Sequence, residues 1–444
     1  MILFTHHTGE PHGILGAQIA ATYFTKRLHI PSIVVGITRA FSQSRLSEFL
    51  DEYYKNRERI IGFSHLCGRK DIIEFIGTLR NMGFSVILGG PQASQDYYGE
   101  EDTEYYPMRF KGLNKVVDLA LKGPVDDVNH ELLRTKHGCF EFPWRRDIFL
   151  NVDWSNLFVF SERLERLEVQ LGQVLSSIGC PYAKARCSVT LDPPAFLQDR
   201  DLRIDIVSHG CTFCDVSKDK GFHGHVGTQS LMSQIRVLPI GEDERSIPFE
   251  LIDEYPIVPL RSLLDSVDEA GIRLSQVNLV CRVDDILSHE RVLHDTARIA
   301  REKGLKIMLA SIGFESFSDT ILRNFNKGIT VEDIVKCVGI LRRLKEEFGE
   351  TFLYRRDEGA NHGFIHPTPW DDGETLPEMN RNIVIHRLFE DVLPEHSTPL
   401  IIHHASYLGD WIREIEARTE IRFTRDGTWI EWWNPVRPEQ PAGL

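Results

Sequence analysis

The chain has 444 residues, 42% of them hydrophobic, and its formal net charge is −14 at pH 7. This length has room for two domains with hydrophobic cores of their own. The acidic balance argues against a nucleic-acid partner or an anionic membrane surface, because phosphate binding needs a basic face. Eight cysteines are too few for a disulfide framework. With no leader peptide or membrane-spanning apolar run in view, a cytoplasmic protein is expected.

Short apolar runs alternate with helical patterns along the first hundred residues. This alternation is typical of a parallel sheet covered on both faces, so we expect a doubly wound, Rossmann-like domain over residues 1–136. Ligands of such sheets lie beyond the carboxyl ends of the strands, which places residues 6–8, 64–70 and 89–94 around one crevice. The expected strands are 2–5, 31–37, 59–64 and 84–90, and the expected helices are 11–28, 42–56 and 70–82.

The following stretch has a weaker pattern. Residues 113–121 and 129–135 have helical apolar spacing, whereas the aromatic, arginine-containing segment 140–151 has no period. We therefore expect residues 137–178 to be a linker that contains one charged connecting helix, at 161–176.

Two closely spaced cysteines, Cys211 and Cys214, follow a short predicted strand that Gly210 ends. Thiols three positions apart can point at one metal centre without straining the backbone, which is why this spacing recurs in zinc and iron–sulfur sites. The pair is only half of such a site. Cys180 and Cys187, just upstream, are the nearest thiols that can complete it.

Strands and helices alternate again after the cysteines. Repeated units of this kind suit a full or partial parallel βα barrel, here residues 179–405, with its chemistry at the carboxyl ends of the strands. Residues 406–444 are expected to form a helix and a hairpin that turns at Asp426–Gly427. The expected barrel strands include 276–281 and 305–315, and the expected helices are 259–270, 288–303 with a Ser288 cap and a Gly304 stop, 330–348 with a Thr330 cap, 378–390 and 408–417.

Three stretches together resemble the radical S-adenosylmethionine superfamily: CTFCDVSKDKGF, VNLVCRVDD and GFESFSDTILRNFNKGITVEDIVKCVGILRRLK. The third is the most specific of them. The first domain is similar to the cobalamin-binding-type domain that precedes the barrel in one branch of this superfamily, through PHGILGAQIAATYF and RIIGFSHLCGRKDIIEFIGTLRNMGFSVILGGPQAS.

The resemblance implies a [4Fe–4S] cluster that is bound by three cysteines and leaves one iron open to S-adenosylmethionine. Cys211 and Cys214 match the last two cysteines of the family motif. An electron donor such as flavodoxin or ferredoxin and a small-molecule or peptide substrate are implied as partners. The cosubstrate residues implied by the match are Phe213 beside the adenine, the acidic pair Asp284 and Asp285, and Gly313, Glu315 and Ser316 from the Gly-x-Glu-Ser phrase.

The chain departs from the family motif at its first cysteine. That residue stands four positions before the second cysteine in the family, and Val207 occupies this position here. GCPY at 179–182 resembles the missing half of an interrupted motif. Cys180 is therefore our first choice for the third ligand and Cys187 our second.

Cobalamin binding is left open. The first domain contains no Asp-x-His-x-x-Gly sequence, so no histidine is evidently placed to ligate cobalt from below. This absence is common both in cobalamin-binding members of the branch and in members without the cofactor. Cys67, Gly89 and Gly90 are expected to face the crevice in either case.

Two classes of function follow. One is a radical enzyme that either transfers a methyl group from cobalamin to an unactivated carbon or phosphorus, or performs a cobalamin-free rearrangement, hydrogen abstraction or ring formation. The other is a zinc-stabilised α/β ligand-binding protein without redox chemistry, in which Cys211 and Cys214 join a nearby histidine. Further expectations are that Cys139, Cys281 and Cys337 are buried hydrophobes, that His209, His223 or His225 would complete such a zinc site, and that His403 and His404 face opposite ways on one strand.

Overall fold

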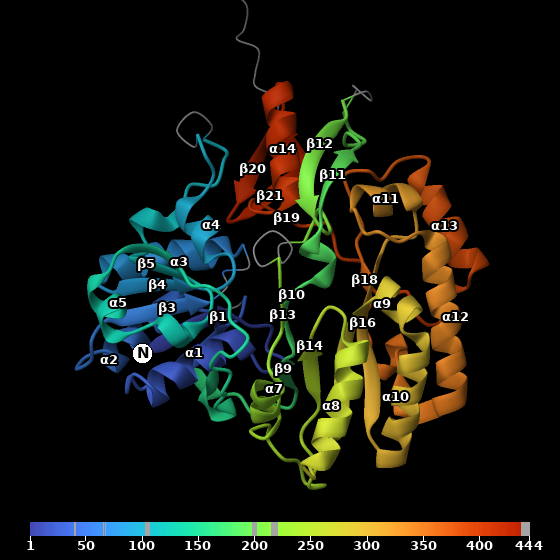
Figure 1. Ribbon diagram of the computed structural model, residues 1–444. Coiled ribbons are helices and arrows are strands. Elements are labelled where there is room, and N and C mark those ends of the chain that lie inside the picture. Colours follow the sequence, from blue (N-terminus) through green and yellow to red (C-terminus); the bar gives the residue numbers. More distant parts are fainter. Residues whose placement is uncertain are drawn as a thin grey trace, which may run out of the picture.

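The structure is a computed structural model that describes residues 1–39, 41–64, 66, 68–102, 107–197, 202–214 and 221–436. Cys67, one of the expected crevice residues, lies outside these ranges. Two α/β units lie side by side, and the C-terminal elements sit above and between them (Figure 1). Within the described residues, no helix is both long enough and apolar enough to cross a bilayer.

The first unit is built on a sheet with the strand order β6-β5-β4-β3-β1-β2-β7-β8. All neighbouring strands are parallel except β7 and β8. The central strands are apolar and buried, as expected for a sheet with helices on both faces. The strands are β1 Ile2–His6, β2 Ile33–Ile37, β3 Ile60–Ser64, β4 Ser85–Gly89, β5 Leu119–Lys122, β6 Gly138–Glu141, β7 Leu157–Phe160 and β8 Leu164–Arg166, and the helices are α1 Leu15–Lys26, α2 Gln43–Tyr53, α3 Lys70–Asn81, α4 Ala93–Tyr98 and α5 His130–Thr135.

The second unit is built on a parallel sheet with the order β9-β14-β15-β16-β17, and β18 also pairs with β16. The sheet is a partial barrel, with α8, α10 and α12 along one side of it (Figure 1). The strands are β9 Gly172–Leu175, β14 Phe249–Ile252, β15 Gln276–Arg282, β16 Lys306–Glu315, β17 Phe352–Leu353 and β18 Gly363–Phe364, and the helices are α7 Thr228–Ile235, α8 Ile257–Glu269, α9 Val283–Ser288, α10 Glu290–Lys303, α11 Asp319–Asn324, α12 Val331–Phe348 and α13 Thr375–Ile385.

The predicted fold class, a Rossmann-like domain followed by a βα barrel, is confirmed by these two sheets. The strongest helix prediction is also confirmed: α12 begins with a capping box between Thr330 and Asp333 and ends at Gly349. α10 likewise ends at Gly304, which adopts the left-handed conformation with φ 62°.

Four local predictions were wrong. Residues 161–176 have helical apolar spacing but form β8 and β9, because β9 completes the second sheet by pairing with β14, and this pairing overrides the local pattern. Residues 113–121 form a short 3₁₀ turn and β5. The last helix of the barrel is α13, which ends before the expected 390. Ser288 ends α9 and does not cap α10, since His289 separates the two helices.

Two antiparallel pairs are inserted after β9, the first barrel strand. β10 (Ser177–Gly179) pairs with β13 (Phe222–His225), and between them the hairpin of β11 (Arg186–Leu191) and β12 (Ile204–His209) extends upward (Figure 1). The chain therefore leaves the barrel edge, forms a hairpin, and returns to the same edge.

The C-terminal elements form a small unit of their own. α14 (Tyr407–Arg418) packs beside a three-stranded sheet of β19 (Ile402–His403), β21 (Trp429–Val436) and β20 (Arg422–Asp426). The expected hairpin is present: Asp426 pairs with Trp429, so that Gly427 and Thr428 form the turn. This unit contacts the first sheet, as described below.

Candidate functional site

Thiols gather at the carboxyl edge of the second sheet. Cys180 lies just beyond β9 and β10, and its backbone N–H donates to Gly221 O (2.9 Å), which closes the insertion at its base. Cys211 and Cys214 follow β12 at the other end of the insertion. Burial, with a smaller contribution from Glu254, raises the pKa of Cys180 to about 11, and the Cys211 thiol is close enough to add to this shift. Two cysteines 31 positions apart are thus electrostatic neighbours.

Cys187 belongs to the same region but lies on the hairpin. It stands opposite Ser208 in the β11–β12 register, and its Sγ lies 3.5 Å from Ser208 O. The Asn326 side-chain amide donates to the same Sγ (3.4 Å) and to Gly210 O (2.7 Å). The Cys187 thiol is therefore held by polar contacts of the hairpin.

Arg282, the last residue of β15, lies beside the thiols. Its Nη1 donates to Cys211 Sγ (3.3 Å), its Nη2 donates to Lys327 O (2.7 Å), and its guanidinium lies 4.0 Å from the centre of the Tyr182 ring. The side chain is only 5% exposed. Burial acts to lower the pKa of Arg282, but Cys211 and Asp284 outweigh burial and raise it. Arg282 is therefore a buried hydrogen-bond donor to the Cys211 thiol.

A buried ion pair stands at the end of β16. Lys327 Nζ lies 2.8 Å from Glu315 Oε1, with side-chain exposures of 5% and 12%. A Cβ added at Gly313 would lie 2.6 Å from Glu315 Oε1, and one at Gly363 would lie 2.8 Å from Oε2, so these two glycines make room for the carboxylate. Burial acts to lower the pKa of Lys327, but Glu315 outweighs it and raises the pKa.

Phe213 lies between the cysteines and this ion pair. Lys327 Nζ is 5.9 Å from the centre of its ring, and the Phe325 ring packs edge-on against it at 4.9 Å. The predicted site residues Cys180, Cys211, Phe213 and Glu315 therefore meet at one edge, together with Cys214, whose backbone N–H donates to Cys211 O (3.3 Å).

The two predicted acidic residues, Asp284 and Asp285, point in different directions. Asp284 faces the site, where it accepts hydrogen bonds from Tyr255 OH (2.5 Å) and from Arg282 Nε (2.8 Å). Asp285 points into the base of α9 and accepts from His289 Nδ1 (2.7 Å), and burial raises its pKa to about 6. Ser316 is also turned away: it is fully buried, and its Oγ contacts Met379 Sδ (3.4 Å).

Sequence reasoning missed three residues of this edge, Arg282, Lys327 and Tyr182. Arg282 and Lys327 stand inside the quoted phrases VNLVCRVDD and FNKG, next to residues that were chosen. For Arg282, a charged residue at the end of an apolar strand was the available signal, whereas Lys327 follows helix α11 and had none of this kind. Tyr182 had no such signal, because its contacts come from Asn326 and Arg282 across the fold.

The remaining cysteines and histidines separate from this site. Cys281 and Cys337 are buried, as predicted, and burial raises the pKa of each, whereas Cys139 on β6 is half-buried. Within the described ranges, the single group of three or more His, Cys, Asp or Glu side chains tight enough for one ion is Asp96, His403 and His404. Among the described residues, no such group includes Cys211 or Cys214.

The carboxyl edge of the first sheet, the expected crevice, is closed by the chain itself. Gly68 has φ 65°, and a Cβ added there would lie 2.2 Å from Trp429 Nε1 of β21. Arg69 spans neighbouring strand tips, because Nη1 lies 3.1 Å from His6 Nδ1 and Nη2 donates to Thr38 O (3.1 Å). Of the predicted pair at the end of β4, Gly89 ends the strand and Gly90 has φ 121°.

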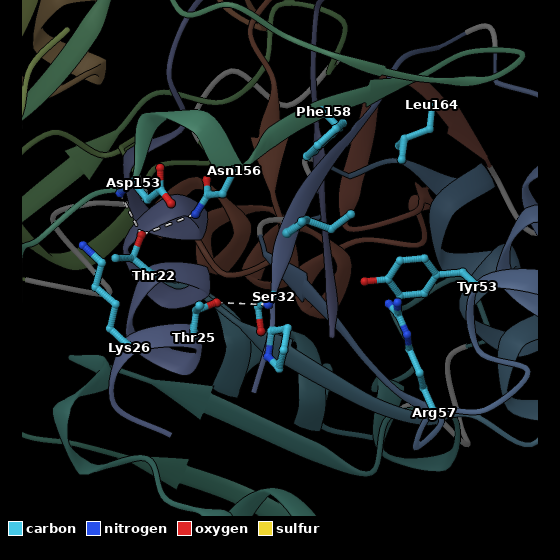
Figure 2. A pocket seen from close by; sticks show the side chains of 12 residues that line it. Thr22, Thr25, Lys26, Ser32, Tyr53, Arg57, Asp153, Asn156, Phe158 and Leu164 are labelled. Atoms are coloured by element: carbon cyan, nitrogen blue, oxygen red, sulfur yellow. Dashed lines mark hydrogen bonds between the residues drawn. The ribbon is translucent and has the colours of Figure 1, made fainter. Parts of the chain in front are cut away.

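A cavity of about 440 Å³ opens at the opposite, amino-end edge of the first sheet (Figure 2). Ile33 at the start of β2 lines it, together with Lys26 and Arg57. It contains none of the predicted site residues, and ligands of doubly wound sheets bind at the other edge.

No protein-family model matches the chain. An uncharacterised protein of Methanocaldococcus jannaschii is 24% identical to it over 302 residues, which are 63% of this chain and 50% of that protein. Among solved structures, the apo, selenomethionine-labelled form of OxsB, a cobalamin-dependent S-adenosylmethionine radical enzyme, is similar with a TM-score of 0.55 and 12% identity. The match covers 97% of this chain and 63% of OxsB.

The fold of nearly the whole chain is therefore similar to that of OxsB. At 12% identity the likeness concerns the fold. The chain spans about half of its curated relative and less than two thirds of OxsB.

Proposed function

We propose that the chain is a radical S-adenosylmethionine enzyme that binds a [4Fe–4S] cluster through Cys180, Cys211 and Cys214. The observation that carries this proposal is the neighbourhood of Cys180 and Cys211 at the carboxyl edge of a parallel barrel, with a buried arginine donating to Cys211 Sγ. Thiolates are the ligands that iron–sulfur clusters take, and three of them leave one iron free for a cosubstrate.

The donor set suits the cluster better than a single ion. A cluster spreads its ligand sulfurs over separate iron atoms, so its thiols need not converge on one point as zinc ligands do. Cys180 and Cys211 approach from the two ends of the insertion, and the guanidinium of Arg282 adds positive charge where thiolates would gather. We choose Cys180 over Cys187 because the Cys187 thiol already has two polar partners on the hairpin side.

The reduced cluster, when bound, supplies one electron that splits the sulfonium of S-adenosylmethionine into methionine and a 5′-deoxyadenosyl radical. The chain's own residues would hold the cosubstrate. The Glu315 carboxylate would accept from its amino group, and Phe213 would pack near its adenine, as in the family that the chain resembles. Lys327, which pairs with Glu315 in the structure, would hold that carboxylate in place. An electron donor such as flavodoxin or ferredoxin would reduce the cluster.

Methyl transfer from cobalamin is the finer part of the hypothesis, and the first sheet fits that cofactor poorly. Trp429 covers the loop at Gly68, and Arg69 ties the tips of β1 and β2 together. No step of the proposal therefore runs through cobalamin. A rearrangement, hydrogen abstraction or ring formation on a small-molecule or peptide substrate uses the same radical and needs no space at that edge.

Anaerobic reconstitution with iron and sulfide tests the proposal. We expect about four irons and four sulfides per chain, an electron paramagnetic resonance signal after reduction, and formation of 5′-deoxyadenosine from S-adenosylmethionine. Cys211→Ala and Cys214→Ala should each lose the cluster, whereas Cys139→Ala, which removes a half-buried thiol of the first sheet, should retain it.

A colourless protein that binds zinc at Cys211 and Cys214 would overturn the proposal. So would full iron and sulfide in both cysteine variants. Adding hydroxocobalamin to the same protein decides the finer question: stoichiometric binding would restore the methyl-transfer version, and its absence would leave the cobalamin-free version.

A further inference from the structure

Two histidines of the C-terminal unit and one aspartate of the first unit meet between the two. Asp96 lies on α4, the helix that follows β4, and His403 and His404 lie at the end of β19. His404 Nε2 is 2.9 Å from Asp96 Oδ1, and His403 Nε2 is 3.6 Å from the same oxygen. The two halves of this cluster are 308 positions apart in the chain.

The expectation that the two histidine rings face opposite ways was wrong. Side chains alternate only while a strand continues, and β19 ends at His403. The chain then turns into α14, so that both rings lie on one side with their centres 4.7 Å apart. The His404 backbone N–H donates to Thr428 O (2.9 Å), which ties this turn to the hairpin of β20 and β21.

The cluster is buried, and its polar atoms converge. The side chains of Asp96, His403 and His404 are 5%, 6% and 3% exposed. One ligand atom from each residue lies within 4.8 Å of the other two. Two imidazoles and one carboxylate are a common protein ligand set for Zn²⁺ and other divalent first-row ions.

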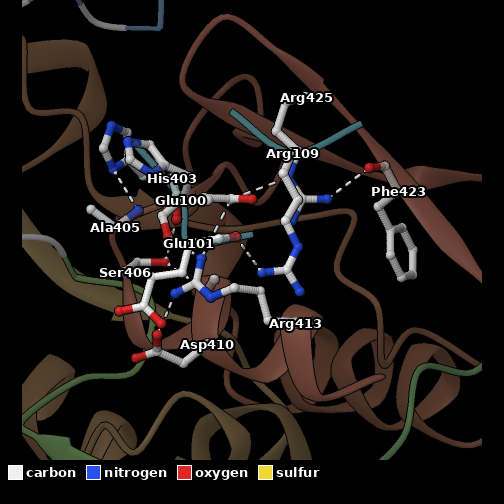
Figure 3. A network of polar contacts seen from close by, with 12 residues as sticks. Glu100, Glu101, Arg109, His403, Ala405, Ser406, Asp410, Arg413, Phe423 and Arg425 are labelled. Atoms are coloured by element: carbon white, nitrogen blue, oxygen red, sulfur yellow. Dashed lines mark hydrogen bonds and ion pairs between the residues drawn. The ribbon is translucent and has the colours of Figure 1, made fainter. Parts of the chain in front are cut away.

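Arg413 and Arg425 of the C-terminal unit form ion pairs close to this cluster. Arg413 pairs with Glu100 (3.4 Å) and with Asp410, and Arg425 pairs with Glu100 (3.2 Å) and with Glu416 (2.8 Å). Figure 3 shows His403 beside this network of ion pairs. The positive charges of Arg413 and Arg425 are thus directed at Glu100, Asp410 and Glu416, and the Asp96 carboxylate contacts the two histidine rings.

We propose that Asp96, His403 and His404 bind one divalent transition-metal ion, of the Zn²⁺ class, that fastens the C-terminal unit to the first domain. The ion would take Oδ1 and the two Nε2 atoms, and water would complete its shell. Ala405 N–H donates to His403 Nδ1 (3.1 Å), so binding at Nε2 moves the ring proton to Nδ1 and breaks this hydrogen bond. Metal–imidazole bonding far exceeds the loss of one such bond.

The site is independent of the proposed cluster, because it shares no residue with it. It is best tested in the full-length Cys211→Ala/Cys214→Ala protein, in which the cysteine pair cannot capture the added ion. We expect one equivalent of Co²⁺ to bind with visible absorption bands of a nitrogen–oxygen site and without thiolate charge-transfer bands, and Zn²⁺ to displace it. Zn²⁺ should also raise the unfolding temperature.

Asp96→Asn and His404→Gln should each weaken Co²⁺ binding at least tenfold. The matched control is His294→Gln, which removes a histidine from a comparable His–Glu pair (3.0 Å) on the surface of the barrel. This control should bind like the parent. The proposal would be overturned if the Cys211→Ala/Cys214→Ala parent bound no Co²⁺, or if the parent, Asp96→Asn and His404→Gln bound it equally well. Neither result bears on cluster loading in the unsubstituted chain.

Discussion

The carboxyl edges of the two parallel sheets are built from different side chains. At the first edge, Gly68 lies against Trp429 from the far end of the chain, and Arg69 joins His6 to Thr38. At the second edge, thiols stand beside a buried guanidinium and a buried ion pair. The first edge is used for internal contact, whereas the second keeps reactive groups together.

This difference shows that the topology fixes where a ligand can bind and the residues decide whether one does. Both sheets are built mainly from parallel strands, and helices pack against each of them. The first edge has lost its exposed crevice to the C-terminal unit, and the second is bounded by Cys180, Arg282 and Glu315 from three different strand ends.

Replacing either Cys180 or Cys187 at the second edge should show which of the two thiols is the third cluster ligand. Cys180→Ala should lose nearly all cluster iron, because a cluster held by Cys211 and Cys214 alone lacks its third ligand. Cys187→Ala should keep most of the iron, since the Cys187 thiol is bound to Ser208 O and the Asn326 amide. Iron and sulfide analysis after parallel reconstitution measures both. The reverse result would make Cys187 the ligand.

Glu315→Gln should weaken S-adenosylmethionine binding tenfold or more while iron content stays high. The variant removes the carboxylate that pairs with Lys327 and leaves a buried ammonium without its counter-charge. Equilibrium binding to the loaded protein measures the affinity. Glu378→Gln is the control, because that carboxylate accepts from Ser318 Oγ outside the site. Equal affinities in the two variants would remove Glu315 from the cosubstrate site.

Below the second edge, the buried His362 side chain should make the stability of the protein depend on pH. His362 accepts from Ile312 N of β16 (3.0 Å), and burial lowers its pKa to about 4. The folded chain thus binds this proton more weakly than the unfolded chain does. Above pH 6.5, His362 is neutral in both the folded and the unfolded chain, so it does not lower the free energy of unfolding. As the pH falls toward 4, the unfolded chain takes up the proton first, and the free energy of unfolding falls by about 3 kcal/mol.

Urea unfolding of the parent and of His362→Gln at pH 7 and pH 4.5 measures this loss. The parent should lose about 2–3 kcal/mol more than the variant over this interval. Asp285, whose pKa is raised to about 6, titrates in both proteins and cancels in the comparison. Parallel pH profiles would show that His362 is not the titrating group.

At the first edge, Gly68→Ala should loosen the contact with the C-terminal unit. Gly83→Ala is the matched control, because Gly83 also has a positive φ, 81°, but an added Cβ there meets nothing within 4 Å. Both variants carry backbone strain, and only Gly68→Ala also displaces Trp429. We expect Gly68→Ala to be less stable than Gly83→Ala by about 1–3 kcal/mol in urea unfolding. Equal stabilities would show that Trp429 yields without cost.

The sequence predicted those parts of the fold that local pattern controls. Apolar strands between helices gave both parallel sheets, and Thr330 with Asp333 and Gly349 gave the two ends of α12. Residues 161–176 failed because their apolar spacing is helical while their partner, β14, lies 77 positions away at Gly172–Phe249. A contact of that kind leaves no trace in a short window of sequence.

The candidate site, like the fold, was predictable only where local sequence motifs determine it. Motif spacing pointed to Cys211, Phe213 and Glu315, which the structure brings to one edge. Asp285 and Ser316 occupy motif positions, but their side chains turn into the protein, because a helix start and a tight turn set their direction. The pairing of Asp96 with His404 was beyond sequence reasoning, since it joins the two ends of the chain.

The β11–β12 hairpin changes the thermodynamics of ligand assembly. In the unfolded chain, bringing Cys180 to Cys211 closes a segment of 211 − 180 = 31 positions, where the family motif closes four. The added loop-closure entropy amounts to about 2 kcal/mol. An early metal cross-link between these residues in the unfolded polypeptide is correspondingly disfavoured. If the proposed cluster forms, pairing of the β11–β12 hairpin before it binds would remove this entropic cost.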